Sequence, residues 1–356
     1  RNSILGIGGG AVLGRQILTG EGDNSNRNHT DPKPERMKFR KLGKTGIQMP
    51  VIGMGCNSMN ENLVRAALER GINYFDTGHY YYKGKNELMF GRVLKPVKRD
   101  SFLISTKVLM PGEDHFKGRI DRQHINRFVE KFEISLKRLQ LEYVDMFLLH
   151  NVGSRQPVLY EPMLEVMEKL KKSGKTRLVG VSTHINEPEV IEAAVDSNVY
   201  DLVMTALNFR QPHRSRMISA LDKAETSGLG IIAMKVMAGA FWDSERKEAI
   251  DNRAALKWVL QHRQVHSALM GMMTFDQLES NLSVLGDQSM KPDDFKALKM
   301  GNETGGLYCA QCGRCRAQCR QQNHIPDMMR AYMYAFGYGM PLKAKETLNQ
   351  LKRQKK

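Results

Sequence analysis

Short apolar runs alternate along the chain with longer amphipathic stretches, from residue 51 to residue 285. Each apolar run has the length of a buried strand, and each amphipathic stretch carries apolar residues at helical spacing. The pattern predicts strands at Val51–Gly55, Ile72–Thr77, Phe102–Lys107, Val144–His150, Leu178–Ser182, Leu202–Leu207, Gly230–Met234 and Ala268–Met272. It predicts helices at Asn62–Arg70, Asn126–Leu139, Pro162–Lys172, Pro188–Ser197, Arg253–Gln261 and Phe275–Leu285.

This alternation of strands and helices predicts an α/β protein, a (β/α)8 TIM barrel. A doubly wound open sheet is the alternative. That fold usually places a G-x-G-x-x-G sequence after its first strand, whereas residues 53–59 read GMGCNSM. We therefore favour the barrel.

Ionisable residues stand at the ends of three consecutive predicted strands. These residues are Asp76, Lys107 and His150, and Tyr81 follows five residues after Asp76. Taken singly, they are explained as a turn residue, a surface lysine and a core histidine. Because active sites of such barrels lie at the C-terminal ends of the strands, the combination predicts one catalytic site.

These four residue types suit the reduction of a carbonyl group, which needs a hydride and a proton. A tyrosine hydroxyl can donate the proton, but its unperturbed pKa is about 10. A nearby ammonium lowers that pKa, and Lys107 would supply this charge with Asp76 holding it in place. His150 would donate a hydrogen bond to the substrate oxygen. We therefore expect Tyr81 to be the proton donor of an oxidoreductase.

Several motifs occur in the order found in the aldo-keto reductases, and the sequence resembles that family over residues 37–285. They are FRKLGKTGIQMPVIGMG (39–55), NYFDTGHYYYKGKNELMFGRVL (73–94), LISTK (103–107), VDMFLLH (144–150), RLVGVSTH (177–184) and FDQLESNL (275–282). The resemblance implies a barrel fold, a small carbonyl substrate and a nicotinamide cofactor. It also implies a catalytic tetrad of Asp, Tyr, Lys and His, and the matching residues are Asp76, Tyr81, Lys107 and His150.

The resemblance implies cofactor contacts at positions where this chain departs from the family. A Ser-Thr pair stands where relatives hold the nicotinamide amide with Ser-Asn, and a methionine stands where an aromatic ring stacks. Some relatives grip the 2′-phosphate with Lys and Arg, which are Gly and Gln here. We expect NADP(H), with NAD(H) as the alternative, at Ser182, Thr183, Met234, Gly271, Gln277 and Asn281.

Four of the five cysteines lie within eleven positions and read C-x2-C-x2-C-x3-C. This spacing favours one [4Fe-4S] cluster over a zinc ion, because zinc sites usually show two separated C-x-x-C pairs. Residues 325–339 resemble the C-terminal segment of iron–sulfur aldo-keto reductases. A cluster here would act as an electron relay or a structural clamp. The predicted ligands are Cys309, Cys312, Cys315 and Cys319, with a fourth ligand from elsewhere as the alternative to Cys319.

The formal net charge of +16 is concentrated in residues 33–44, 309–322 and 343–356. The nearly neutral body argues against a nucleic-acid binder, and no apolar run is long enough for an integral membrane span. An acidic redox partner fits the basic segments, and solvated chain ends explain them equally well. The alternative to an enzyme is a non-catalytic barrel, a scaffold or regulatory protein that docks through its basic ends.

The first residues resemble the end of a twin-arginine export signal, because Arg1 is followed by a Gly-rich apolar run. We expect export to the periplasm and keep a cytoplasmic location as the alternative. The predicted organisation is a signal-like leader and linker at 1–36, the barrel at 37–290, a small Cys-rich helical extension at 300–342 resembling a 4Fe-4S ferredoxin, and a basic tail at 343–356.

Overall fold

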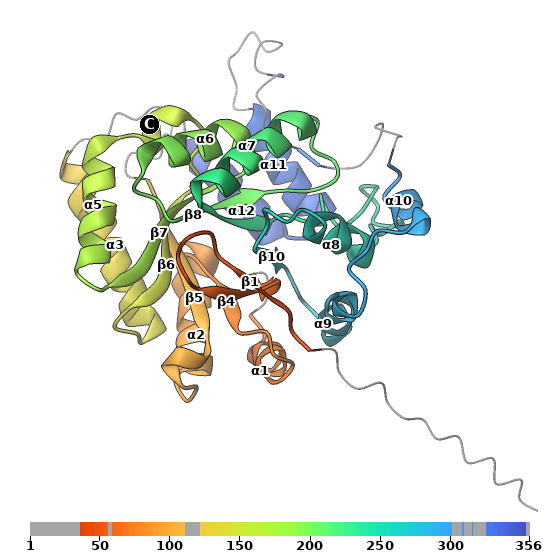
Figure 1. Ribbon diagram of the computed structural model, residues 1–356, viewed down its shortest axis with the longest axis horizontal. Coiled ribbons are helices and arrows are strands. Elements are labelled where there is room, and N and C mark those ends of the chain that lie inside the picture. Colours follow the sequence, from red (N-terminus) through yellow and green to blue (C-terminus); the bar gives the residue numbers. More distant parts are fainter. Residues whose placement is uncertain are drawn as a thin grey trace, which may run out of the picture. The chain divides into compact units, whose positions relative to one another are not determined.

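A closed parallel barrel forms the centre of the protein (Figure 1). The computed structural model describes residues 36–55, 59–110, 122–300, 308–309, 315 and 325–353. The barrel strands follow the order β10–β3–β4–β5–β6–β7–β8–β9. Each predicted strand coincides with one of them, and the barrel prediction is confirmed. They are β3 (Ile52–Met54), β4 (Tyr74–Asp76), β5 (Leu103–Leu109), β6 (Val144–His150), β7 (Thr176–Thr183), β8 (Leu202–Ala206), β9 (Gly230–Met234) and β10 (Ser267–Met270).

Helices surround the barrel, and all six predicted helices are present. These are α1 (Glu61–Glu69), α3 (Arg122–Leu139), α5 (Glu161–Lys172), α6 (Glu187–Ser197), α8 (Asn252–Leu260) and α9 (Phe275–Leu282). The structure adds α2 (Lys85–Leu94), α4 (Arg155–Val158), α7 (Arg214–Ser227) and α10 (Pro292–Ala297). Single turns of 3-10 helix lie at Tyr81–Gly84, Arg99–Ser101 and Ser283–Leu285.

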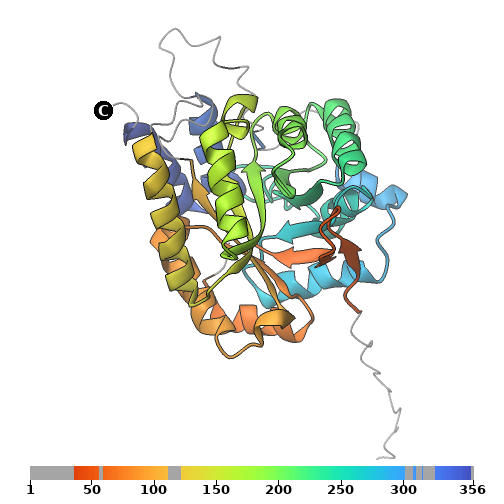
Figure 2. The same ribbon diagram turned by 60° about the vertical axis from the view of Figure 1, so that its left-hand side comes forward.

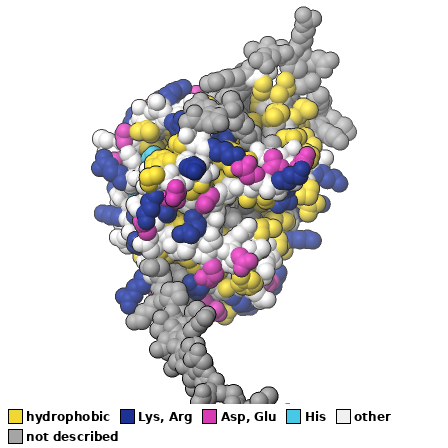
Figure 3. Space-filling view, turned by 90° about the vertical axis from the view of Figure 1, so that its right-hand side faces the viewer, with side chains coloured by type: hydrophobic (Ala, Val, Ile, Leu, Met, Phe, Trp, Pro, Cys, Tyr) yellow, Lys and Arg dark blue, Asp and Glu magenta, His cyan; other side chains and the backbone are white. Residues whose placement is uncertain are grey.

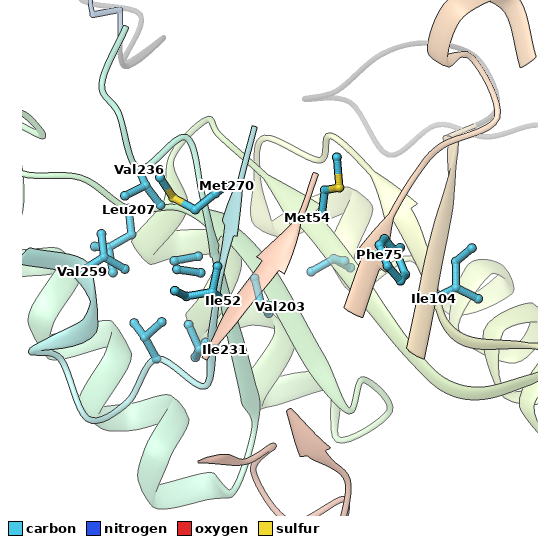
Figure 4. Close-up of a cluster of buried hydrophobic side chains, with 14 of the residues drawn as sticks. Ile52, Met54, Phe75, Ile104, Val203, Leu207, Ile231, Val236, Val259 and Met270 are labelled. Carbon is cyan, nitrogen blue, oxygen red and sulfur yellow. The ribbon is translucent and has the colours of Figure 1, made fainter. Parts of the chain in front are cut away.

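Two apolar cores lie on the two faces of the barrel sheet. The larger one fills the space between strands and helices and includes Ile52, Phe75 and Val203 (Figure 4). The smaller one fills the barrel interior and includes Leu148 and Met204. Because successive strand residues point to opposite faces, a strand buried on both faces reads as a continuous apolar run.

A hairpin closes one end of the barrel. Its strands β1 and β2 (Phe39–Lys41 and Gln48–Pro50) pair antiparallel. Leu42, in the turn between them, belongs to the inner core. The Lys44 backbone N–H donates to the Gly228 carbonyl at 2.9 Å, just before β9 begins. The hairpin therefore covers the N-terminal strand ends and leaves the C-terminal ends for chemistry.

A helical C-terminal segment follows the cysteine-rich region. It consists of α11 (Ile325–Tyr332), a π-helical turn (Met333–Gly337) and α12 (Pro341–Arg353), and we call it the cap. The dark blue helices of Figure 2 are α11 and α12. The predicted basic tail at 343–356 thus begins inside α12. The signal-like leader lies outside the described residues.

The surface in Figure 3 shows basic and acidic side chains interspersed over one face, without a stripe of one sign. Among the described helices, none is long and apolar enough to cross a membrane.

Candidate active site

A buried ion pair joins the C-terminal ends of β4 and β5. The Lys107 Nζ donates to the two carboxylate oxygens of Asp76 at 2.7 and 2.6 Å, and to the Thr77 carbonyl at 2.6 Å. Ser105, which pairs with Asp76 in the β4–β5 register, donates its hydroxyl to the same carboxylate at 2.6 Å. Lys107 is 1% exposed. These three acceptors match the three donors of an ammonium group.

Tyr81 lies beside this pair, in the turn that follows β4. Its hydroxyl is 3.4 Å from Nε2 of His150, and the centre of its ring is 4.8 Å from the Lys107 Nζ. A side chain at Gly78 would meet both Tyr81 and Lys107 within 3.2 Å, so glycine allows their close approach. Because β4, β5 and β6 are neighbours in the barrel, the four predicted catalytic residues meet at one end of it.

A second buried network fixes the turn that carries Tyr81, and the sequence analysis assigned no role to its members. Glu87 is fully buried and accepts hydrogen bonds from Thr106 at 2.7 Å and from Arg138 at 3.1 Å. Arg138 also donates to the His79 carbonyl at 3.0 Å. Burial, with the charges of Arg138 and Lys131, lowers the pKa of His79 to about 4. No local motif signals this network, because its members come from different elements.

The predicted nicotinamide residues lie at the ends of β7 and β9. The Ser182 hydroxyl accepts from the Asn151 backbone N–H at 3.0 Å, and the Thr183 hydroxyl donates to the Ile185 carbonyl at 2.8 Å. Both hydroxyls are therefore hydrogen-bonded to backbone groups in this structure. Met234 is partly buried and packs against the inner core. The amide of a nicotinamide would have to share the two hydroxyls with these backbone groups.

The predicted phosphate residues lie around the start of α9. Gly271 and Gln277 are exposed, and the Gln277 side chain accepts from the Met273 N–H at 2.7 Å. Thr274 caps the helix by accepting from the Gln277 N–H at 3.2 Å. Asn281 is 2% exposed, and its carbonyl oxygen accepts from Asn252 at 2.8 Å. An exposed helix N-terminus favours an anion, so this edge of the barrel fits the phosphate end of a dinucleotide.

Two of the predicted cluster ligands, Cys309 and Cys315, belong to the described residues. The Cys309 N–H donates to the thioether of Met333 at 3.4 Å, and its thiol lies 3.9 Å from the Pro326 carbonyl oxygen. Cys312 and Cys319 lie outside the described residues. Among the residues that are described, no three potential metal ligands come together.

Comparison with known proteins agrees with this geometry. The model of the aldo/keto reductase family matches residues 57–254. L-galactose dehydrogenase of Arabidopsis thaliana is 25% identical over an aligned length of 309 residues, and the match covers 76% of this chain and 92% of the relative. The holo form of an aldo-keto reductase from Bacillus halodurans has a TM-score of 0.59 at 22% identity, covering 76% of this chain and 98% of that one.

An aldo-keto reductase from Klebsiella pneumoniae, solved in complex with NADPH, has a TM-score of 0.56 at 21% identity and covers 76% of this chain and 99% of that one. At these identities the two structures support the fold alone. The family model spans more than half of the chain and includes the strands that carry the buried pair and the histidine. The chain therefore belongs to the aldo/keto reductase family and is an oxidoreductase of that type.

Proposed function

We propose that the protein uses NADP(H), or alternatively NAD(H), to interconvert a small aldehyde or ketone and the corresponding alcohol. The observation that carries this proposal is the convergence of Tyr81 and His150 on the buried Asp76–Lys107 pair. A substrate oxygen that approaches the Tyr81 hydroxyl also comes within reach of His150.

Each residue of the tetrad has one role in this proposal. Tyr81 donates its proton to the carbonyl oxygen, and His150 donates a hydrogen bond to the same oxygen. The ammonium of Lys107 favours the phenolate that remains, and Asp76 keeps Lys107 in place. When bound, the dinucleotide supplies the hydride that goes to the carbonyl carbon, so the C=O bond becomes CH–OH.

The open edge at Gly271 and Gln277 would hold the phosphate end of the dinucleotide, with Asn281 behind it. Ser182 and Thr183 would hold the nicotinamide amide, and Met234 would pack against the ring. That the Klebsiella pneumoniae relative was solved with NADPH supports the choice of cofactor.

The test replaces the proton donor. We expect Tyr81→Phe to lower the rate of NADPH oxidation with a generic aldehyde by about 10²- to 10⁴-fold. The matched control is Tyr332→Phe, because Tyr332 is 40% exposed on α11. Equal rates for Tyr81→Phe and the unchanged protein would refute the assignment of the proton donor.

One observation favours the alternative of a non-catalytic barrel. The hydroxyls of Ser182 and Thr183 are hydrogen-bonded to backbone groups, which compete with the amide of a nicotinamide. Equilibrium binding of NADPH, followed by fluorescence, separates the two functions. A scaffold would neither bind the dinucleotide nor turn over an aldehyde.

We also propose that Cys309, Cys312, Cys315 and Cys319 bind a [4Fe-4S] cluster. The contacts of Cys309 with Met333 and Pro326 favour a structural role, because they tie the cysteine segment to the cap. Anaerobic purification should give brown protein with iron and sulfide. Bleaching by NADPH would identify an electron relay, for which the basic segments suit an acidic partner. A colourless protein with zinc would overturn the cluster.

Export by the twin-arginine route is a separate proposal, supported by Arg1 and the Gly-rich run behind it. Fractionation of cells producing the full-length protein should place it in the periplasm. Accumulation of the mature protein in the cytoplasm alone would refute the proposal.

A further inference from the structure

The cap spans the C-terminal mouth of the barrel. Arg330 of α11 donates to the His184 carbonyl after β7 at 2.9 Å, and Tyr334 accepts from Lys235 after β9 at 2.8 Å. Lys343 of α12 lies 5.2 Å from the centre of the Tyr81 ring, after β4. In the closed strand order β8 lies between β7 and β9, and β4 lies on the opposite side of the barrel from β8. The cap therefore reaches from one side of the mouth to the catalytic tyrosine on the other.

Three cations gather where the cap meets the mouth. The Nζ atoms of Lys235 and Lys343 lie 4.8 and 4.9 Å from the centre of the Tyr334 ring. Burial raises the pKa of Tyr334, but the charges of Lys235, Lys343 and Arg330 outweigh it and lower the pKa to about 7. Burial, together with the charges of Arg330 and Lys343, lowers the pKa of Lys235 to about 8, against the opposing effect of Tyr334. The cations therefore favour the phenolate of Tyr334, and three positive side chains against one phenolate leave the cluster with a net positive charge.

Arg330 supplies independent evidence that this cluster can bind a further anion. It is 1% exposed, and Nη2 donates to the His184 carbonyl, while Nε and Nη1 have no hydrogen-bond partner among the described residues. A buried charged group with open donors is costly unless an anion satisfies it.

Two carboxylates lie in this region. Glu187, which is fully buried, lies 3.1 Å from Nε2 of His213. Glu346 is partly buried and lies near both Lys343 and Lys83. Neither carboxylate accepts a hydrogen bond from Nε or Nη1 of Arg330, so these two donors are open to a negative group of a ligand.

We propose that Lys343, Lys235 and Arg330 form a subsite for an anionic group of the substrate, a carboxylate attached close to the carbonyl. This inference rests on the proposed carbonyl reduction, because it places the reacting oxygen at Tyr81. Lys343 lies 5.2 Å from the centre of that ring. A carboxylate on Lys343 is therefore separated from a carbonyl at the tyrosine hydroxyl by only about two or three carbon atoms.

The experiment compares two aldehydes that differ in charge, succinic semialdehyde and butanal. In the unchanged protein we expect a higher kcat/KM for succinic semialdehyde. Lys343→Met should lower the ratio of the two kcat/KM values about tenfold, mainly through KM for the charged aldehyde, because a hydrogen bond to a charged group is lost. Lys343→Arg should restore part of the preference. Lys345→Met is the matched control, since Lys345 is exposed on the same helix.

Other outcomes would overturn the subsite. An equal loss with both aldehydes would show that Lys343 tunes Tyr81 rather than binding a carboxylate. Weaker NADPH binding by Lys343→Met, with the aldehyde preference intact, would assign the anion to a cofactor phosphate.

A binding measurement separates failure of the subsite from failure of the proposed reaction. Saturation-transfer NMR should detect 4-hydroxybutanoate but not 1-butanol on the unchanged protein, and Lys343→Met should abolish the signal. This signal without any aldehyde turnover would refute the proposed reaction and keep the subsite. Turnover of butanal without this signal would refute the subsite and keep the reaction.

Discussion

The Asp76–Lys107 pair allows a quantitative test of the active-site geometry. Asp76→Asn leaves the Lys107 ammonium buried, at 1% exposure, with an amide in place of the carboxylate that takes two of its hydrogen bonds. Removing one partner from a buried ion pair costs about 3–5 kcal/mol, because the remaining charge has no counter-ion. We expect the free energy of unfolding, measured by urea denaturation followed by circular dichroism, to fall by about 3 kcal/mol or more.

A double-mutant cycle isolates the interaction between the two side chains. Combining Asp76→Asn with Lys107→Met should cost about 2–3 kcal/mol less than the sum of the single changes, because no unpaired charge is then buried. If the loss of stability in the double variant equals the sum of the two single losses within about 0.5 kcal/mol, the reasoning is refuted, because the two groups then do not interact.

Asp145 provides a matched control at the opposite end of the barrel. It is fully buried near the start of β6, where Arg99 and Arg177 each donate to it at 2.8 Å. Asp145→Asn should lower stability yet leave aldehyde turnover unchanged, whereas Asp76→Asn should lower both. A loss of turnover in both variants would show that the effect comes from destabilisation of the barrel rather than from the site.

Two further predictions concern the residues around the site. Burial and the charges of Arg138 and Lys131 lower the pKa of His79 to about 4. The NMR signals of its ring, assigned by comparison with His79→Asn, should therefore not titrate between about pH 5 and 8. Because an unfolded histidine titrates near pH 6.5, stability relative to His79→Asn should fall as the pH drops from about 6.5 towards 4, and a rise would contradict the burial. Gly180→Ala places a Cβ 2.4 Å from the Leu202 carbonyl oxygen and should cost about 2–3 kcal/mol in urea denaturation. Gly55→Ala, whose nearest contact is 3.5 Å, is the control and should change stability by less than about 0.5 kcal/mol; equal costs would refute the clash.

The barrel could be predicted from sequence because its strands are buried on both faces. Val144–His150, for example, is nearly all apolar, and β6 has the same bounds. The hairpin could not be predicted in this way. Its strands have three residues each, and β1 reads FRK with two basic residues. It is held by contacts to distant turns, such as the Lys44–Gly228 hydrogen bond, which leave no local pattern.

The meeting of Asp76, Tyr81, Lys107 and His150 could be predicted because each of them stands close to the C-terminal end of a strand, and strand order alone brings consecutive ends together. The cationic cluster could not. Lys235 and Tyr334 are 99 residues apart, and Lys343 read as the first residue of a basic tail. Charge alone does not distinguish a solvated lysine from one that lies over the ring of Tyr81. Only the path of the cap across the mouth does so.

The same cap connects Cys309 with the mouth of the barrel. Its own apolar core is small, consisting of Ala331, Met333, Tyr334 and Ala344. Met333 accepts the Cys309 N–H, and the next residue, Tyr334, accepts from Lys235. With so little apolar burial, these polar contacts must contribute much of what fixes the cap over the barrel. Two consecutive residues of the cap thus link Cys309 with Lys235, and so with the mouth of the barrel.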